Sequence, residues 1–195
     1  KTNANNFLEK SKILSKNLKQ IFSISTDKAV SPFSLLGVSK KFMEYRLSQF
    51  KSLNKKIRVS SVRFANVSFS NGSILKNIVD KIENKQPLGV PQKVKRFFIT
   101  HQEAVNLCLK SLLNICDCKI LIPETKLLGK QKSIEILAKD ILNINKLKIT
   151  KNKKKHLNKN LFYVKFSKIL FSGQKNEETL ITFKEKNLSK KYYNF

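Results

Sequence analysis

Glycine is scarce in this chain, with 5 in 195 residues, and the glycines never form the pattern G-x-G-x-x-G. Placed after a strand, that pattern lets the backbone of an α/β protein approach the pyrophosphate of a dinucleotide. These residues therefore lack the usual dinucleotide-binding loop. If the protein uses such a cofactor, we expect the loop to lie in a part that this sequence does not contain.

Long apolar runs are also missing. None approaches the roughly 18–20 apolar residues that a membrane-spanning helix needs, and the first residues carry no apolar core of a secretory signal. We expect no transmembrane segment in this chain. The expected location is the cytoplasm, or the inner face of the membrane.

Cysteine and histidine are too few and too scattered for a metal centre. Cys108, Cys116 and Cys118 do not have the spacing of zinc ligands, and His101 and His156 are far apart in the sequence. We expect reduced cysteines, with Cys108 in the core, and no bound metal.

Arginine supplies only four of the 40 basic residues, and with 13 acidic residues the net charge is +27. Sites for nucleic acid use the forked guanidinium as well as lysine, whereas lysine is spread over this whole chain. We expect a solvated lysine surface and no nucleic-acid partner. The positive charge still favours anionic ligands.

Apolar periodicity predicts strands that alternate with helices, which is typical of parallel βαβ units and an α/β fold. We expect one domain over residues 1–150 and a C-terminal segment, 151–195, with a basic linker at 152–160 and a mobile tail. Strands are predicted at 20–25, 57–64, 87–91, 119–122 and, as the last one, 146–149. Helices are predicted at 7–18, 33–50, 73–83, 103–113 and 133–142.

Polar chemistry is concentrated directly after the first predicted strand, where open α/β sheets bind their ligands. Taken alone, Thr26-Asp27-Lys28 would be a capped turn with a surface ion pair. With Pro32, Gly37 and Lys40 at their distances, we favour a catalytic role. The segment reads Ser25-Thr26-Asp27-Lys28-Ala29-Val30-Ser31-Pro32, followed by Gly37-Val38-Ser39-Lys40.

Three later blocks follow this segment along the chain: Arg63-Phe64-Ala65-Asn66-Val67 with Ser70-Asn71-Gly72-Ser73, Arg96-Phe97-Phe98-Ile99-Thr100 with Glu103-Ala104-Val105, and Gly173-Gln174-Lys175 with Glu178, Leu180 and Thr182. Together they resemble the extended short-chain dehydrogenase/reductase superfamily, and most closely its polysaccharide-biosynthesis branch of UDP-N-acetylglucosamine 4,6-dehydratases. The resemblance covers the second half of a family member. It implies the C-terminal half of a Rossmann-like NAD(P)-binding fold with a small substrate-binding part, and a chain that is a fragment.

The resemblance also implies an activity, in the synthesis of precursors for surface polysaccharides or glycans. Such enzymes take a hydride from C4 of a UDP-sugar to NAD or NADP, eliminate water across C5 and C6, and return the hydride to C6. By position, Lys28 would be the base at C5 and Asp27 the acid at the departing C6 hydroxyl. Thr26 would hydrogen-bond the C4 oxygen. Lys40 would hold the nicotinamide ribose, and Ala65 would also contact the cofactor.

On the substrate side, the resemblance implies Asn66, Ser73 and Arg96 as ligands of the sugar and diphosphate. Ser73 is equally well explained as a helix cap alone. In a chain that otherwise uses lysine, Arg63 and Arg96 indicate a need for bidentate geometry toward a phosphate or a carboxylate. Of the two arginines, Arg96 is the preferred diphosphate ligand. Phe97 and the phenylalanine after it are assigned to the core.

One position departs from the superfamily. Leu36 stands where most short-chain dehydrogenases carry a tyrosine four residues before the lysine. Because leucine cannot accept a proton, Asp27, Lys28 or a water would have to deprotonate the C4 hydroxyl. The resemblance therefore implies that an alternative proton acceptor serves this step.

Two alternatives stay open. One is an epimerase on the same scaffold, which would not need the Asp27-Lys28 pair. The other is a non-catalytic remnant that binds a UDP-sugar, favoured by the missing glycine-rich loop, by Leu36 and by Phe171-Ser172 in the last block. We expect the isolated chain to be inactive and the full-length protein to be a homo-oligomer.

Overall fold

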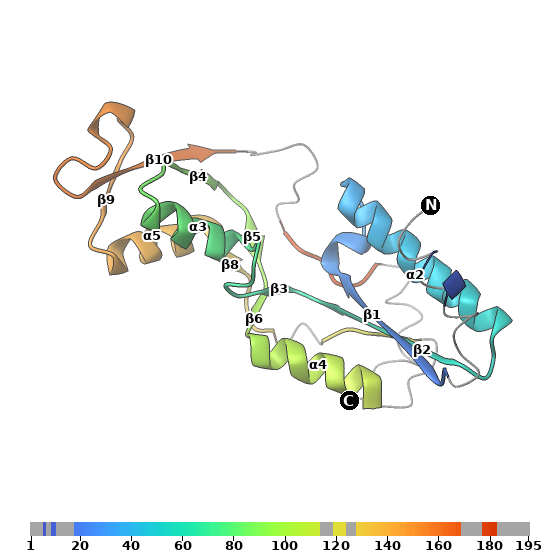
Figure 1. Ribbon diagram of the computed structural model, residues 1–195. Coiled ribbons are helices and arrows are strands. Elements are labelled where there is room, and N and C mark those ends of the chain that lie inside the picture. The colour runs from blue at the N-terminus through green and yellow to red at the C-terminus, as the bar shows by residue number, and fades with distance from the viewer. Residues whose placement is uncertain are drawn as a thin grey trace. The chain divides into compact units, whose positions relative to one another are not determined.

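The computed structural model describes residues 6, 9–10, 18–113, 119–123, 128–168 and 177–182 (Figure 1). The predicted helix at 7–18 and the predicted tail lie mostly or wholly outside these residues. The chain forms two compact units, which alternate along the sequence. Of the described residues, unit 1 contains those up to 64, with 102–113, 119–123 and 179–182. Unit 2 contains 65–101, 128–168 and 177–178.

Unit 1 is built on a parallel three-stranded sheet in the order β1-β2-β7. β1 and β2 pair over their whole length, from Gln20 opposite Arg58 to Thr26 opposite Phe64. Because parallel neighbours need a crossover, a helix follows β1 and returns the chain to β2. The elements are β1 (Gln20–Thr26), η1 (Asp27–Ala29), α2 (Leu35–Leu53), β2 (Arg58–Phe64), α4 (His101–Leu113) and β7 (Lys119–Leu121).

Helix α2 packs on the sheet through a small apolar core. Leu47 and Phe50 on the helix contact Ile21 of β1 and Val59 of β2. The helix begins at Leu35, directly after the N-cap Ser34, whose side chain accepts a hydrogen bond from the amide of Gly37 at 3.1 Å. This is later than the predicted start after Pro32, because the Ser34 hydroxyl caps the first turn.

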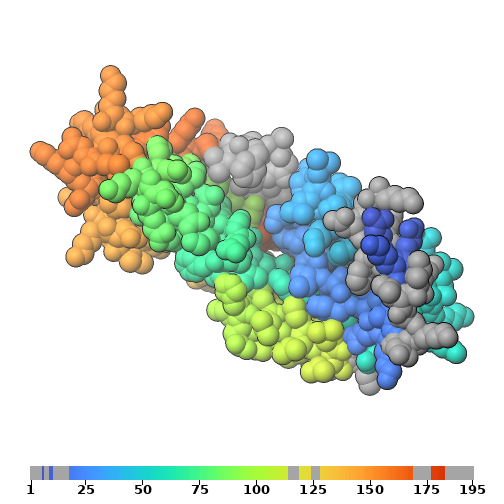
Figure 2. All heavy atoms as spheres, viewed as in Figure 1, coloured from blue at the N-terminus to red at the C-terminus, as the bar shows by residue number. Residues whose placement is uncertain are grey.

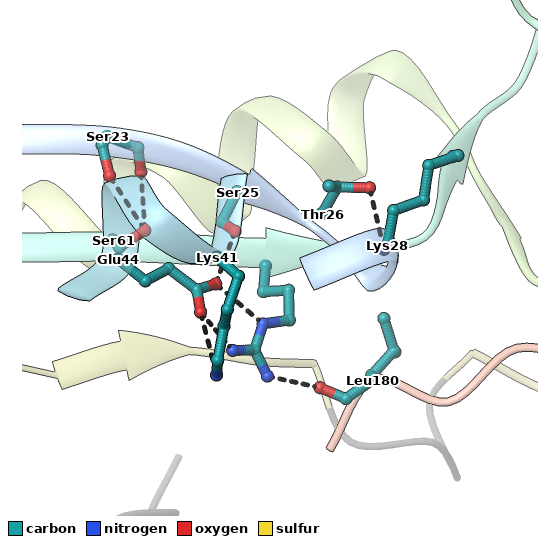
Figure 3. Close-up of polar contacts among 9 residues, drawn as sticks. Ser23, Ser25, Thr26, Lys28, Lys41, Glu44, Ser61 and Leu180 are labelled. Carbon is teal, nitrogen blue, oxygen red and sulfur yellow. Dashed lines mark hydrogen bonds and ion pairs between the residues drawn. The ribbon is translucent and has the colours of Figure 1, made fainter. Parts of the chain in front are cut away.

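Near the carboxyl end of β1, a buried ion pair joins α2 to β2 (Figure 3). Arg63 is 0% exposed, and its Nε and Nη2 donate to the two oxygens of Glu44 at 3.1 and 2.8 Å. Ser25 Oγ donates to the same carboxylate at 2.5 Å, and Arg63 Nη1 donates to the Leu180 carbonyl at 2.9 Å. The bidentate partner predicted for Arg63 is thus a carboxylate of the protein.

Unit 2 has its own parallel sheet, in the order β4-β10-β9, with two short ladders. Its core joins residues of both helices and of the central strand, including Ile78, Ile134, Leu142, Phe162 and Val164. The loop with η2 projects into solvent (Figure 2, orange). The elements are β3 (Asn66–Val67) paired with β6 (Phe98–Ile99), β5 (Lys95–Arg96) paired with β8 (Lys132–Ser133), α3 (Ile74–Glu83), β4 (Leu88–Pro91), α5 (Ile134–Ile144), β9 (Lys148–Thr150), η2 (Lys153–Lys155) and β10 (Leu161–Ser167).

The prediction that the strand near 146–149 is the last one was wrong. β10 follows it and is the central strand of the unit 2 sheet, between β4 and β9. Its buried Phe162 and Val164 alternate with less buried residues, which is the strand signal that the lysine-rich surroundings obscured. The domain boundary expected at residue 150 falls inside unit 2.

Within the residues that the structure describes, no helix has both the length and the apolar character needed to cross a bilayer.

Replacing Arg63 by methionine tests the importance of the buried pair. Arg63→Met leaves the Glu44 carboxylate buried without its strongest partner, so we expect a loss of about 3–5 kcal/mol in the free energy of unfolding. Urea denaturation followed by circular dichroism measures it. Arg58→Met is the control, because Arg58 is exposed on the same strand and should change stability by only about 0.5 kcal/mol. Equal losses in both variants would contradict this role for the pair.

Candidate active-site residues

The structure brings Thr26, Asp27 and Lys28 together at the carboxyl end of β1. Figure 3 shows two of them, Thr26 and Lys28. Thr26 Oγ1 donates to Asp27 Oδ1 at 2.6 Å and accepts a long hydrogen bond from the Lys28 amide at 3.4 Å. Lys28 Nζ lies 3.6 Å from Asp27 Oδ1. Asp27 is buried, whereas the Lys28 side chain is 47% exposed. The result is a hydroxyl, a carboxylate and an ammonium in one cluster, with the ammonium open to solvent.

The features of a simple capped turn are also present. Thr26 is the N-cap of the η1 turn, and Asp27 and Lys28 form the ion pair that such a turn would carry. Burial is what departs from that simple explanation. A surface ion pair keeps both charges in water, whereas the carboxylate of Asp27 is largely withdrawn from solvent.

Gly37 fixes where this turn lies. A Cβ on residue 37 would stand 2.5 Å from the carbonyl oxygen of Lys28 and 3.2 Å from Cα of Pro32. Only a residue without a side chain allows the first turn of α2 to approach the η1 turn so closely. The spacing between Lys28 and Gly37 in the sequence motif therefore corresponds to a direct packing contact.

Lys40 lies one helical turn after Leu36 on α2, so the two residues share a face of the helix. Lys40 Nζ donates to the Ile24 carbonyl of β1 at 2.9 Å. An ammonium has three N–H donors, a donor chemistry that suits the hydroxyls of a ribose. Leu36 is 54% exposed. The contact with the nicotinamide ribose that the resemblance implies for Lys40 stays a prediction.

In unit 2, the predicted substrate ligands Asn66 and Arg96 both contact Glu178. Asn66 Nδ2 donates to Glu178 Oε1 at 2.6 Å, and Arg96 Nε lies 3.3 Å from the same oxygen. Ala65 is buried, and Ser73 caps α3 by accepting a hydrogen bond from the Lys76 amide at 3.2 Å. The cap assigned to Ser73 as one of its two explanations is therefore present.

Glu178 was not among the predicted site residues. It stands in the last sequence block, as one acidic residue near the C-terminus, and nothing in its immediate neighbours distinguishes it from Glu177. Its burial and its partners from β3 and from the β5–β6 segment appear only in the fold. The signal that could have found it is the block that it shares with Gly173 and Leu180.

A pocket of about 220 Å³ lies within unit 1, between α2 and the strands β2 and β7. Glu44 and Ser61 line it with Lys119, but none of the predicted catalytic residues does. Cys108 is a free thiol, and partial burial raises its pKa, which keeps it in the unreactive thiol form.

Comparison with known proteins decides the family. A model described as "Polysaccharide biosynthesis protein" matches residues 2–195. The chain belongs to this polysaccharide biosynthesis protein family. This match confirms the resemblance to the extended short-chain dehydrogenase/reductases of the polysaccharide-biosynthesis type that the sequence blocks indicate.

One curated protein that this chain resembles is the capsular polysaccharide biosynthesis protein CapD of Staphylococcus aureus. The two are 31% identical over 123 residues, which are 63% of this chain and 20% of CapD. The chain therefore spans about a fifth of the length of this relative.

Two solved structures have a fold similar to that of this chain. Pen from Bacillus thuringiensis has a TM-score of 0.73 and 20% identity, with 92% of this chain and 51% of Pen covered. A UDP-glucuronic acid 4-epimerase from Bacillus cereus, solved with a UDP-deoxyfluoro-glucuronic acid and NAD, has a TM-score of 0.65 and 16% identity, with 94% of this chain and 59% of that chain covered. The similarity confirms the α/β, Rossmann-like fold class, over somewhat more than half of each neighbour.

Replacing Gly37 by alanine tests how tightly the candidate catalytic turn is held. Because the new Cβ meets backbone, Gly37→Ala should cost about 1–3 kcal/mol in the free energy of unfolding, measured by urea denaturation. Ser39→Ala, an exposed change on the same helix, is the control and should stay within about 0.5 kcal/mol. If Gly37→Ala were as stable as its control, the close approach would not constrain the turn.

Proposed function

We propose that the protein containing this chain is a nucleotide-sugar 4,6-dehydratase of the UDP-N-acetylglucosamine type. The observation that supports this most is the contact between Asp27 and Lys28 at the carboxyl end of β1. Elimination of water needs a base for one carbon and an acid for the leaving oxygen of the next. Two adjacent groups in one turn can supply both functions, Lys28 as the neutral amine and Asp27 as the neutral carboxylic acid.

The cofactor proposed is NAD or NADP, which when bound supplies the acceptor and later the donor of the sugar hydride. Lys40 would hold the nicotinamide ribose through N–H donors, in addition to its bond to the Ile24 carbonyl. Ala65, small and buried, would also contact the cofactor. Thr26 would hydrogen-bond the C4 oxygen of the sugar.

The proposed elimination balances within the Asp27-Lys28 pair. The Lys28 amine takes the proton from C5, the C5–C6 double bond forms, and the C6 hydroxyl leaves as water with the proton of the Asp27 carboxyl group. The amine has then gained a proton and the carboxyl group has lost one. This leaves the two groups as an ion pair. Lys28 gives its proton back to C5 when C6 is reduced, and the proton released from the C4 hydroxyl replaces the one that Asp27 gave, so both groups return to their starting forms.

A second candidate function is epimerisation of a UDP-sugar at C4. It is supported by the fold similarity to the UDP-glucuronic acid 4-epimerase. Epimerisation at C4 moves a hydride off and back at one carbon, so it gives the Asp27-Lys28 pair no role in removing water. Cytoplasmic location and homo-oligomerisation stay predictions.

The product distinguishes the two functions. We expect the full-length protein, given UDP-N-acetylglucosamine with NAD or NADP, to form a 4-keto-6-deoxy sugar that is lighter by one water, detected by mass spectrometry. Lys28→Met and Asp27→Asn should each lower kcat by about 10²–10⁴-fold, the usual contribution of a general acid or base. Lys55→Met, an exposed change in the turn after α2, is the control and should leave kcat unchanged.

A C4 epimer of unchanged mass as the product would refute the dehydratase proposal in favour of the epimerase. Full kcat in both Lys28→Met and Asp27→Asn would show that the pair does not catalyse the reaction.

A further inference from the structure

We propose that Glu178 is a positioning residue for the nucleotide-sugar site, and that it orients Arg96 and Asn66 toward different parts of the ligand. This inference rests on the proposed function. In the arrangement that we infer, Arg96 binds the diphosphate, and Asn66 binds a hydroxyl or N–H group of the ligand. Glu178 touches neither the reacting atoms nor the ligand, and acts by orienting these two side chains.

The carboxylate of Glu178 collects three donors within unit 2. It accepts from Asn66 Nδ2 at 2.6 Å and from the Phe97 amide at 2.8 Å, and it pairs with Arg96 Nε at 3.3 Å. Glu178 is itself buried. A buried carboxylate requires such donors, and each charge-assisted bond is stronger and more directional than a neutral one.

The backbone of Glu178 is held as well. Its amide donates to Gln131 Oε1 at 3.3 Å, and its carbonyl accepts from Gln131 Nε2 at 3.2 Å. One side-chain amide therefore satisfies both backbone groups of this residue. Glu178 is therefore held through its backbone as well as through its carboxylate. A residue that acts by orienting other side chains must itself be held in this way.

These contacts decide what Asn66 can offer to a ligand. Its Nδ2 donates to Glu178 Oε1 and also to the Phe97 carbonyl at 3.1 Å, and a primary amide has two N–H donors. Both partners are acceptors, so the orientation of the amide is unambiguous. The group left to face a ligand is the acceptor Oδ1, which suits a hydroxyl or N–H. A phosphate oxygen offers no hydrogen to it, so of the sugar and diphosphate contacts expected of Asn66, this inference keeps the sugar contact and adds the base as an alternative.

Arg96 is oriented differently. Its Nε pairs with Glu178, and its Nη1 donates to the Lys95 carbonyl at 2.7 Å. Two anchored nitrogens fix the plane of the guanidinium group. A guanidinium held in one plane presents its donors in the forked geometry that matches phosphate oxygens.

Glu177 is the matched control that the chain itself provides. It is the preceding residue and carries the same charge, but its side chain is 61% exposed and pairs at the surface with Lys95 Nζ at 3.2 Å. Glu178→Gln and Glu177→Gln make the same chemical change one residue apart. Only the first removes the charge from the buried cluster.

The experiment is calorimetric titration of the full-length protein with UDP. We expect wild type and Glu177→Gln to bind UDP equally, and Glu178→Gln to raise the Kd by on the order of tenfold to a hundredfold. In turnover, Glu178→Gln should raise KM for the UDP-sugar and leave kcat within about twofold, because uniform binding is lost and no transition-state contact is removed.

Each result has one meaning. If the wild type does not bind UDP, the proposed function fails. If it binds and Glu178→Gln binds as tightly, or Glu177→Gln weakens binding equally, the positioning role of Glu178 is refuted. If Glu178→Gln does not fold, Arg96→Lys replaces it, since lysine keeps the charge but loses the planar fork. An unchanged melting temperature with a Kd raised at least tenfold supports the proposal, and an unchanged Kd overturns it.

Discussion

The buried Arg63–Glu44 pair is the constraint on which the described part of unit 1 depends. It joins the end of β2 to the middle of α2, takes in Ser25 of β1, and holds the carbonyl of Leu180 near the other end of the sequence. Burying two charges is costly, and the cost is offset only where both are fully hydrogen-bonded. The bidentate geometry and the added Ser25 bond meet that condition, so these segments are held in one arrangement at the carboxyl end of the sheet.

Acidic residues are few in this chain, and three of the buried polar residues are acidic. Asp27 belongs to the candidate catalytic turn, Glu44 to the pair with Arg63, and Glu178 to the cluster with Arg96. Among the described residues, none of the lysines is buried. Lysine forms the solvated surface, whereas these three carboxylates lie inside the units and pair there with hydrogen-bond donors or cations.

The candidate catalytic turn depends on two different physical effects. Its polar groups converge because β1 ends at Thr26 and the next residues form a capped η1 turn. Its position against α2 depends on sterics, since Gly37 lets the helix meet the Lys28 carbonyl. The chemistry proposed for Asp27 and Lys28 therefore requires a residue nine positions away that carries no functional group at all.

The sequence by itself determined the α/β class, most element positions and the Thr26-Asp27-Lys28 turn, because apolar periodicity, caps and strand ends are local properties. Only the tertiary structure decided that Arg63 binds Glu44, that Asn66 and Arg96 meet at Glu178, and that β10 is the central strand of its sheet. The side-chain contacts among these join residues from 19 to 112 positions apart. A buried carboxylate takes its donors from whichever strands the fold brings to it, and sequence spacing carries no record of that choice.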